Sequence, residues 1–155
     1  MINRTILLVE DNPSDEVLTL RALKKSGIPN DVAVVRDGAE ALDYLFCTGS
    51  FVDRNRLDMP AVILLDLNLP KIGGLDALRR IRQNPATRYL PVVILTSSDE
   101  VEDRIKGYGC GANSFVRKPV EFDRFFLAVQ QLGLYWLILN EPLPSNSGAL
   151  SPDEA

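Results

Sequence analysis

The chain has 155 residues, of which 46% are hydrophobic and 25% are charged, and its formal net charge at pH 7 is −4. These values suit one domain with one core, and an acidic chain without a basic stripe disfavours nucleic acid or an anionic membrane as the main partner. No apolar run approaches the roughly 20 residues of a membrane-spanning helix, and the N-terminus lacks the features of a secretory signal, so we expect a cytoplasmic protein.

In the first half of the chain, two strand-like apolar runs, 5–9 and 32–35, each precede a helical pattern. Asn12-Pro13 predicts the cap and the first position of the first helix, and Gly27 predicts its end. Apolar residues recur at helical spacing in both helices, as Val17, Leu20 and Leu23 in the first and as Ala41, Leu42, Leu45 and Phe46 in the second. A polar connection of unusual length follows at 48–59.

Three further strand-like runs, 61–65, 92–95 and 114–117, alternate with helical patterns in the second half. The apolar residues of these helices are Leu75, Leu78 and Ile81, then Val101, Ile105 and Tyr108, and finally Phe122, Phe125, Phe126, Val129, Leu132 and Trp136. We expect one domain over residues 1–139 and a disordered tail, rich in Pro, Ser and acidic residues, over residues 140–155.

This alternation predicts an α/β fold, with a doubly wound parallel sheet between helices in three layers. The runs at 63–65 and 92–95 are apolar on both strand faces, as in central strands, whereas the second and fifth runs are mixed, as in edge strands. We expect the strand order 2-1-3-4-5. Ligands then bind outside the carboxyl ends of the strands, at the switch point between the first and third.

Polar side chains stand at these strand ends: Glu10-Asp11, Asp66, Thr96 and Lys118. The absence of histidine excludes a Ser-His-Asp triad and histidine metal ligands, and we expect the two cysteines, Cys47 and Cys110, to be inert thiols. Three clustered carboxylates favour a bound cation, and oxygen ligands select Mg²⁺ or Mn²⁺. The pattern predicts a carboxylate nucleophile beside a metal, with a hydroxyl and a lysine opposite to meet a phosphoryl group.

With these strand ends, the chain resembles a response-regulator receiver domain from about residue 4 to residue 139. The motifs that carry the resemblance are Leu8-Val9-Glu10-Asp11-Asn12, Leu65-Asp66-Leu67-Asn68-Leu69-Pro70, Gly73-Gly74, Leu95-Thr96-Ser97 and Lys118-Pro119. Each motif is weak alone, but together and in this order they are specific. The resemblance implies a flavodoxin-like fold and a Mg²⁺-dependent, self-catalysed transfer of a phosphoryl group from a partner histidine kinase, without turnover of a small molecule.

The resemblance also implies roles for individual residues. Asp66 matches the family's phospho-acceptor. Glu10, Asp11, Asp66 and the backbone carbonyl of Asn68 match the groups that bind the metal ion in the family. Thr96 and Phe115 match the switch positions, and Lys118 matches the lysine that contacts the phosphoryl group. The chain departs from the usual pattern in having Glu10 for Asp, Phe115 for Tyr and Ser97 for a smaller residue.

The segment 45–54 and the aromatic last helix with Trp136 are similar to a narrower group, the stand-alone receivers paired with bacterial phytochrome-type histidine kinases. The last helix has little polar face and needs cover on more than one side. We therefore expect a homodimer, and the alternative is cover by the tail or by the long connection.

Two other functions compete with this one. A Mg²⁺-dependent phosphatase of the haloacid-dehalogenase type would use Asp-x-Asp, but Asn68 stands two residues after Asp66. A flavodoxin-like flavin binder would have a Ser-, Thr- or Gly-rich loop after the first strand, where this chain has Glu-Asp-Asn-Pro. Taken singly, Asp66 could be a capping carboxylate and Phe115 an ordinary edge-strand aromatic, while Gly73-Gly74 indicates only backbone geometry ahead of a helix.

Overall fold

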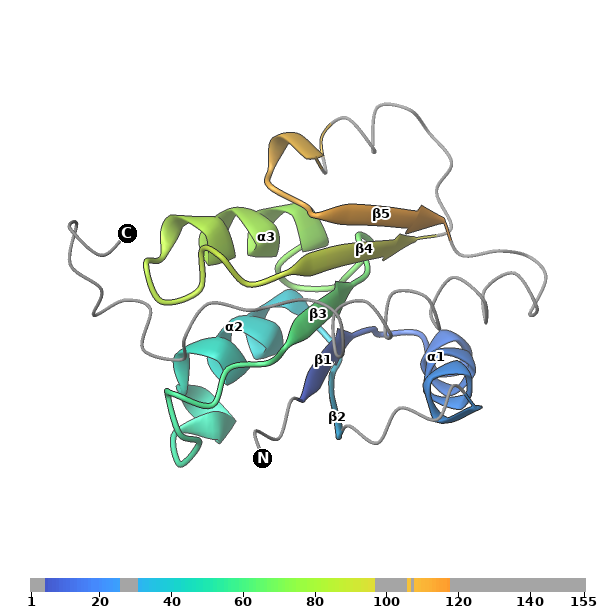
Figure 1. The fold of residues 1–155 in the computed structure, drawn as a ribbon, viewed down its shortest axis with the longest axis horizontal. Coiled ribbons are helices and arrows are strands. Elements are labelled where there is room, and N and C mark those ends of the chain that lie inside the picture. Colours follow the sequence, from blue (N-terminus) through green and yellow to red (C-terminus); the bar gives the residue numbers. More distant parts are fainter. Residues whose placement is uncertain (1–4, 26–30, 97–105, 107, 118–155) are drawn as a thin grey trace.

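Five parallel strands form one sheet in the computed structural model, which describes residues 5–25, 31–96, 106 and 108–117. The sheet has the order β2-β1-β3-β4-β5 (Figure 1), which confirms the predicted topology. The strands are β1 (Ile6–Val9), β2 (Val32–Val35), β3 (Val62–Leu65), β4 (Val92–Thr96) and β5 (Ser114–Arg117). All five lie where the apolar runs predicted them, with shifts of one residue at three ends.

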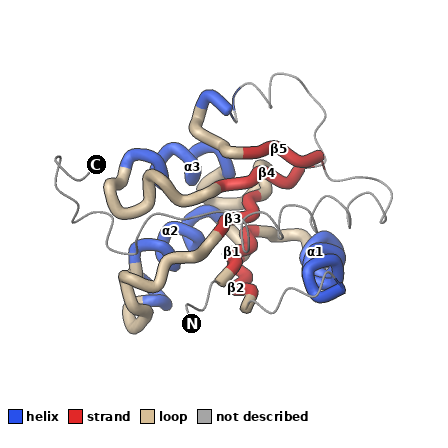
Figure 2. Tube along the Cα trace, in the orientation of Figure 1, coloured by secondary structure: helices blue, strands red, loops and turns tan. Residues whose placement is uncertain are grey.

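Helices cover both faces of the sheet and give the expected three layers. Helix α1 (Pro13–Lys25) lies on one face, and α2 (Gly38–Phe46) and α3 (Gly74–Gln83) lie on the other (Figures 1 and 2). The prediction of Pro13 as the first residue of α1 is confirmed. The predicted stop at Gly27 and the predicted last helix lie outside the described residues. None of the helices within the described ranges is long and apolar enough to cross a membrane.

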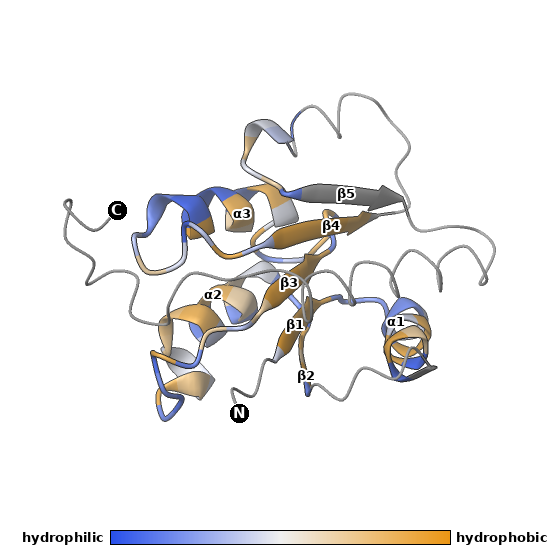
Figure 3. Ribbon diagram, in the orientation of Figure 1, coloured by the Kyte–Doolittle hydropathy of each residue, from blue (hydrophilic) through white to orange (hydrophobic). Residues whose placement is uncertain are grey.

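The core is divided in two because successive side chains of a strand point to opposite faces. On one face, Leu7 and Val9 pack in a cluster with residues of α2 and α3. On the other face, Ile6 and Leu8 pack in a cluster with residues of α1. Figure 3 shows β1, β3 and β4 coloured as hydrophobic along their length. The central strands therefore have no polar face, and polar chemistry is confined to their ends.

The connection at 48–59 is more ordered than its polar composition indicated. It contains the 3₁₀ turn η1 (Gly49–Phe51), and the Phe51 ring meets the Tyr44 ring edge-on with centroids 5.1 Å apart. The guanidinium of Arg54 lies 4.2 Å from the centre of the Tyr44 ring, and its Nε donates to the Tyr44 carbonyl at 2.8 Å. The segment is thus packed against α2. Among its residues, Val52 and Leu57 remain exposed.

Both cysteines are free thiols, as expected from the sequence. Cys47 is buried and follows α2 in a left-handed conformation, with φ of 56°. Cys110 is partly buried and packs against the core. Tyr108, predicted on the apolar face of the fourth helix, is 53% exposed.

Candidate metal and phosphoryl site

Glu10 and Asp66 are brought together because β1 and β3 are neighbours in the sheet. The amide of Glu10 donates to the Val35 carbonyl at 3.0 Å, and the amide of Asp66 donates to the Val9 carbonyl at 3.1 Å. The backbone pairing therefore continues one residue beyond each strand and holds both residues at the sheet edge. Their exposures are only 2% for Glu10 and 8% for Asp66.

A third carboxylate, that of Asp15 in the first turn of α1, joins these two. One carboxylate oxygen from each of Glu10, Asp15 and Asp66 lies within 4.8 Å of the other two. At this separation two unit charges repel by about 3 kcal/mol at an effective dielectric constant of 20. A divalent cation among the three would replace this repulsion with attraction, so the donor set fits the hard ions expected from the sequence.

Asp11, expected in the acidic site from the sequence, is exposed and does not belong to this group. Asp11 follows the last backbone pairing of β1, and its side chain is exposed whereas that of Glu10 is buried. Sequence analysis missed Asp15. The signal available was an acidic residue at the third position of a helix that begins at Pro13, where a side chain points back towards the preceding strand.

The turn after Asp66 shapes the other side of the site. The amide of Asn68 donates to Oδ1 of Asp66 at 3.0 Å, which orients the carboxylate. A Cβ atom built on Gly74 would lie 2.3 Å from the Asp66 carbonyl oxygen and 2.7 Å from Cα of Leu67. Only glycine allows α3 to begin this close to the strand end, which supports the prediction of a backbone role for Gly74. At Gly73 the same atom would meet nothing within 4 Å.

The predicted phosphoryl-contact residues are described in part. Thr96 is the last residue of β4 and pairs in register with Arg117 of β5, so its backbone lies at the same sheet edge as Asp66. Phe115 pairs with Ile94 in the middle of β5. For both residues the backbone alone is described, and Lys118 lies outside the described residues.

Comparisons with known proteins point to one family. The profile of the response regulator receiver domain matches residues 6–130. Response regulator Rcp1 of Synechocystis sp. is 38% identical over 134 residues, which cover 86% of this chain and 89% of Rcp1. The crystal structure of its Mn²⁺-bound form is similar with a TM-score of 0.81 at 36% identity, covering 90% of this chain and 99% of that one.

Two other solved structures are similar. The phosphorylated cyanobacterial phytochrome response regulator RcpA has a TM-score of 0.83 at 36% identity, covering 90% of this chain and 98% of RcpA. The bacteriophytochrome response regulator AtBRR has a TM-score of 0.71 at 55% identity, covering 89% of this chain and 98% of AtBRR.

Proposed function

The chain belongs to the response regulator receiver domain family and accepts a phosphoryl group in two-component signalling, and we propose that Asp66 is the acceptor, with a divalent cation bound beside it. The observation that carries this assignment is the place of Asp66. It is a buried carboxylate at the carboxyl end of a central strand, next to a second buried carboxylate, that of Glu10.

The metal would be Mg²⁺, with Mn²⁺ as a substitute, held by Glu10, Asp11, Asp66 and the backbone carbonyl of Asn68. These donors are all oxygens, which fits a hard ion that keeps several of its waters. When bound, the metal neutralises negative charge on the phosphoryl group during transfer. Asp11 is exposed in the structure, so its part in the site would require its side chain to turn towards Glu10 and Asp66.

The chemistry proposed for Asp66 is an in-line displacement at phosphorus. A carboxylate oxygen of Asp66 forms the new O–P bond while the P–N bond of the donor phosphohistidine breaks, and the leaving imidazole takes up a proton from solvent. The amide of Asn68, which donates to Oδ1, holds the carboxylate in one orientation for the attack. Thr96 and Lys118 would contact the phosphoryl oxygens, and Phe115 would be the aromatic switch. Hydrolysis of phosphorylated Asp66 by water would be catalysed by the protein itself, without a small-molecule substrate.

The assignment is tested with acetyl phosphate or beryllofluoride in the presence of Mg²⁺. We expect one adduct per chain by intact-mass spectrometry, its loss in Asp66→Asn, and its loss when Mg²⁺ is chelated. Asp53→Asn is the matched control, because it removes the same charge from an exposed site in the segment 48–59. An Asp66→Asn variant that is still modified at the wild-type level would disprove the assignment.

The donor is proposed to be a phytochrome-type histidine kinase, because RcpA and AtBRR are described as phytochrome and bacteriophytochrome response regulators. Phosphotransfer from a panel of purified kinases tests this proposal, and preferential transfer from a kinase of another type would contradict it. Family membership favours signalling over the phosphatase and flavin-binding alternatives.

We further propose that the domain ends at residue 139, that residues 140–155 form a disordered tail, and that the protein is a cytoplasmic homodimer. The family match ends at residue 130, and the last helix that motivated the homodimer lies outside the described residues. Sedimentation with and without beryllofluoride tests the dimer, and monomer at high concentration under both conditions would remove it.

A further inference from the structure

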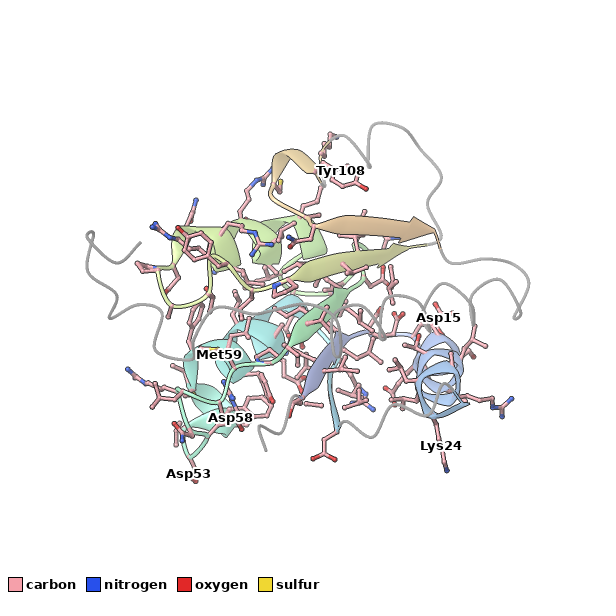
Figure 4. The ribbon with its side chains drawn as sticks, viewed as in Figure 1. Asp15, Lys24, Asp53, Asp58, Met59 and Tyr108 are labelled. Atoms are coloured by element: carbon pink, nitrogen blue, oxygen red, sulfur yellow. The ribbon has the colours of Figure 1, made fainter. Side chains whose placement is uncertain are left out.

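The first turn of α1 carries two acidic residues whose side chains have different surroundings. The Glu16 carboxylate lies 2.9 Å from the guanidinium of Arg36, in the connection between β2 and α2. The Asp15 carboxylate belongs instead to the group formed with Glu10 and Asp66. Figure 4 labels Asp15 on α1. Of the two neighbours, only Asp15 is directed to the strand ends.

The local backbone explains why Asp15 points there. Oδ1 of Asn12 accepts hydrogen bonds from the amides of Ser14 at 2.9 Å and of Asp15 at 3.2 Å, which caps the helix and fixes its first turn. The amide of Asn12 donates in turn to Oε2 of Glu10 at 3.4 Å. One short turn therefore holds the strand-end carboxylate and the helical carboxylate in a fixed relation.

We propose that Asp15 is a further metal-site residue, which holds the divalent cation directly or through a bound water, together with Glu10 and Asp66. The metal site itself rests on the proposed function, which family membership and the Mn²⁺-bound structure of Rcp1 support; the placement of Asp15 is what this structure adds. The receiver resemblance assigned metal contacts only to Glu10, Asp11, Asp66 and Asn68, and Asp15 is not among them.

The distances fit a shared cation. Mg²⁺ binds oxygen at about 2.0–2.1 Å, so two ligands on opposite sides of the ion lie about 4.2 Å apart. The three carboxylate oxygens are within 4.8 Å of one another. Among three ligands of an octahedral ion at most one pair is opposite, and adjacent ligands lie about 2.9 Å apart. Direct binding by all three carboxylates therefore requires their side chains to rotate towards the ion, whereas a water between Asp15 and the ion requires a smaller movement.

Mn²⁺ binding to the full chain tests the proposal without a phosphorylation assay. Free Mn²⁺ is measured by its electron paramagnetic resonance signal during titration at physiological salt. We expect Asp15→Asn to weaken Mn²⁺ binding about tenfold or more, in the range found for groups that support metal ligands. Glu16→Gln is the matched control, because it removes the same charge from the same helical turn, and screening should limit its effect to about twofold. Asp15→Glu keeps the carboxylate and should recover most of the affinity.

The Asp66→Asn variant distinguishes failure of the proposed function from failure of the proposed role of Asp15. If Asp66→Asn binds Mn²⁺ as tightly as the wild type, the metal is not at this site, and the proposed function fails together with this inference. If Asp66→Asn weakens binding while Asp15→Asn does not, the role of Asp15 is overturned and the proposed function stands. Equal losses in Asp15→Asn and Glu16→Gln would also overturn it, because they would show a general charge effect. Circular dichroism establishes that each variant is folded, and should Asp15→Asn not fold, Asp15→Ser and Asp15→Glu decide the question.

Discussion

Replacement of Gly74 by alanine should destabilise the protein and slow phosphorylation of Asp66 together. Gly74 begins α3, and alanine in a helix is normally more stable than glycine by about 0.5–1 kcal/mol. Here the new Cβ would lie 2.3 Å from the Asp66 carbonyl oxygen and 2.7 Å from Cα of Leu67. Both are backbone atoms, so no side-chain rotation can relieve the contact.

The expected change in the free energy of unfolding is the difference between the cost of this clash and the gain from alanine in a helix. Overpacking of a well-packed interior costs about 1–3 kcal/mol, and rigid backbone neighbours place the cost at the upper end of that range. After subtraction of the helical gain, we expect Gly74→Ala to lower the free energy of unfolding by about 2 kcal/mol. Because the clash pushes on the backbone of Asp66, we expect a displacement near 1 Å, which slows phosphoryl transfer by about 100-fold.

Gly73→Ala is the control, since the same methyl group one residue earlier would meet nothing within 4 Å. Gly73 has φ of −65° and ψ of 160°, a conformation that alanine adopts easily. We expect this variant to match the wild type within about 0.5 kcal/mol. Urea denaturation followed by circular dichroism gives the stabilities, and acetyl phosphate with Mg²⁺ gives the rates. A Gly74→Ala protein as stable and as reactive as Gly73→Ala would refute the argument.

Three further predictions concern α2 and the segment that follows it. Asp37→Ala should lower the free energy of unfolding by about 1 kcal/mol in urea denaturation, because Oδ1 of Asp37 accepts the Glu40 amide at 2.7 Å and caps α2; no loss of stability would contradict the cap. Arg54→Met should keep most of the packing on Tyr44 but leave the backbone carbonyls of Tyr44 and Asp58 without their hydrogen-bond donor. We expect this loss to lower the stability of the segment 48–59 by about 1–3 kcal/mol, so amide hydrogen exchange in 48–59 should rise while exchange in β1 changes little. Burial raises the pKa of Tyr44 above its ordinary value of 10.0. The unfolded chain therefore loses the phenolic proton at lower pH than the folded protein, so the free energy of unfolding should fall as pH rises above about 10. The Tyr44→Phe variant should lack this part of the pH dependence when unfolding is measured from about pH 9 to about pH 12.

The sheet and its order were predictable from the sequence because they depend on local patterns. Runs such as Val62–Leu65, apolar on both faces, can be stable only between two layers of helices, and alternation with helices makes the strands parallel. The meeting of Glu10 and Asp66 followed from that topology alone, since the carboxyl ends of neighbouring parallel strands share one edge.

The segment 48–59 could not be predicted in the same way. Its polar composition indicated an ordinary loop, whereas Arg54 stacks on Tyr44 and donates to a carbonyl ten residues away. Hydrophobic periodicity contains no signal for a contact between a charged side chain and a distant backbone group, because such a contact depends on where α2 ends in space.

The strand-end carboxylates were thus readable from the order of residues, but the approach of Asp15 to Glu10 and Asp66 was not. Asp15 lies on the first turn of a helix, which has no fixed direction relative to the strand before it. Whether Asp15 faces the site depends on the angle at which α1 leaves β1, set by Asn12 and by the packing of α1 on the sheet. The packing of α1 against the sheet decides that angle, because the direction of a side chain depends on where the backbone of its helix lies in three dimensions.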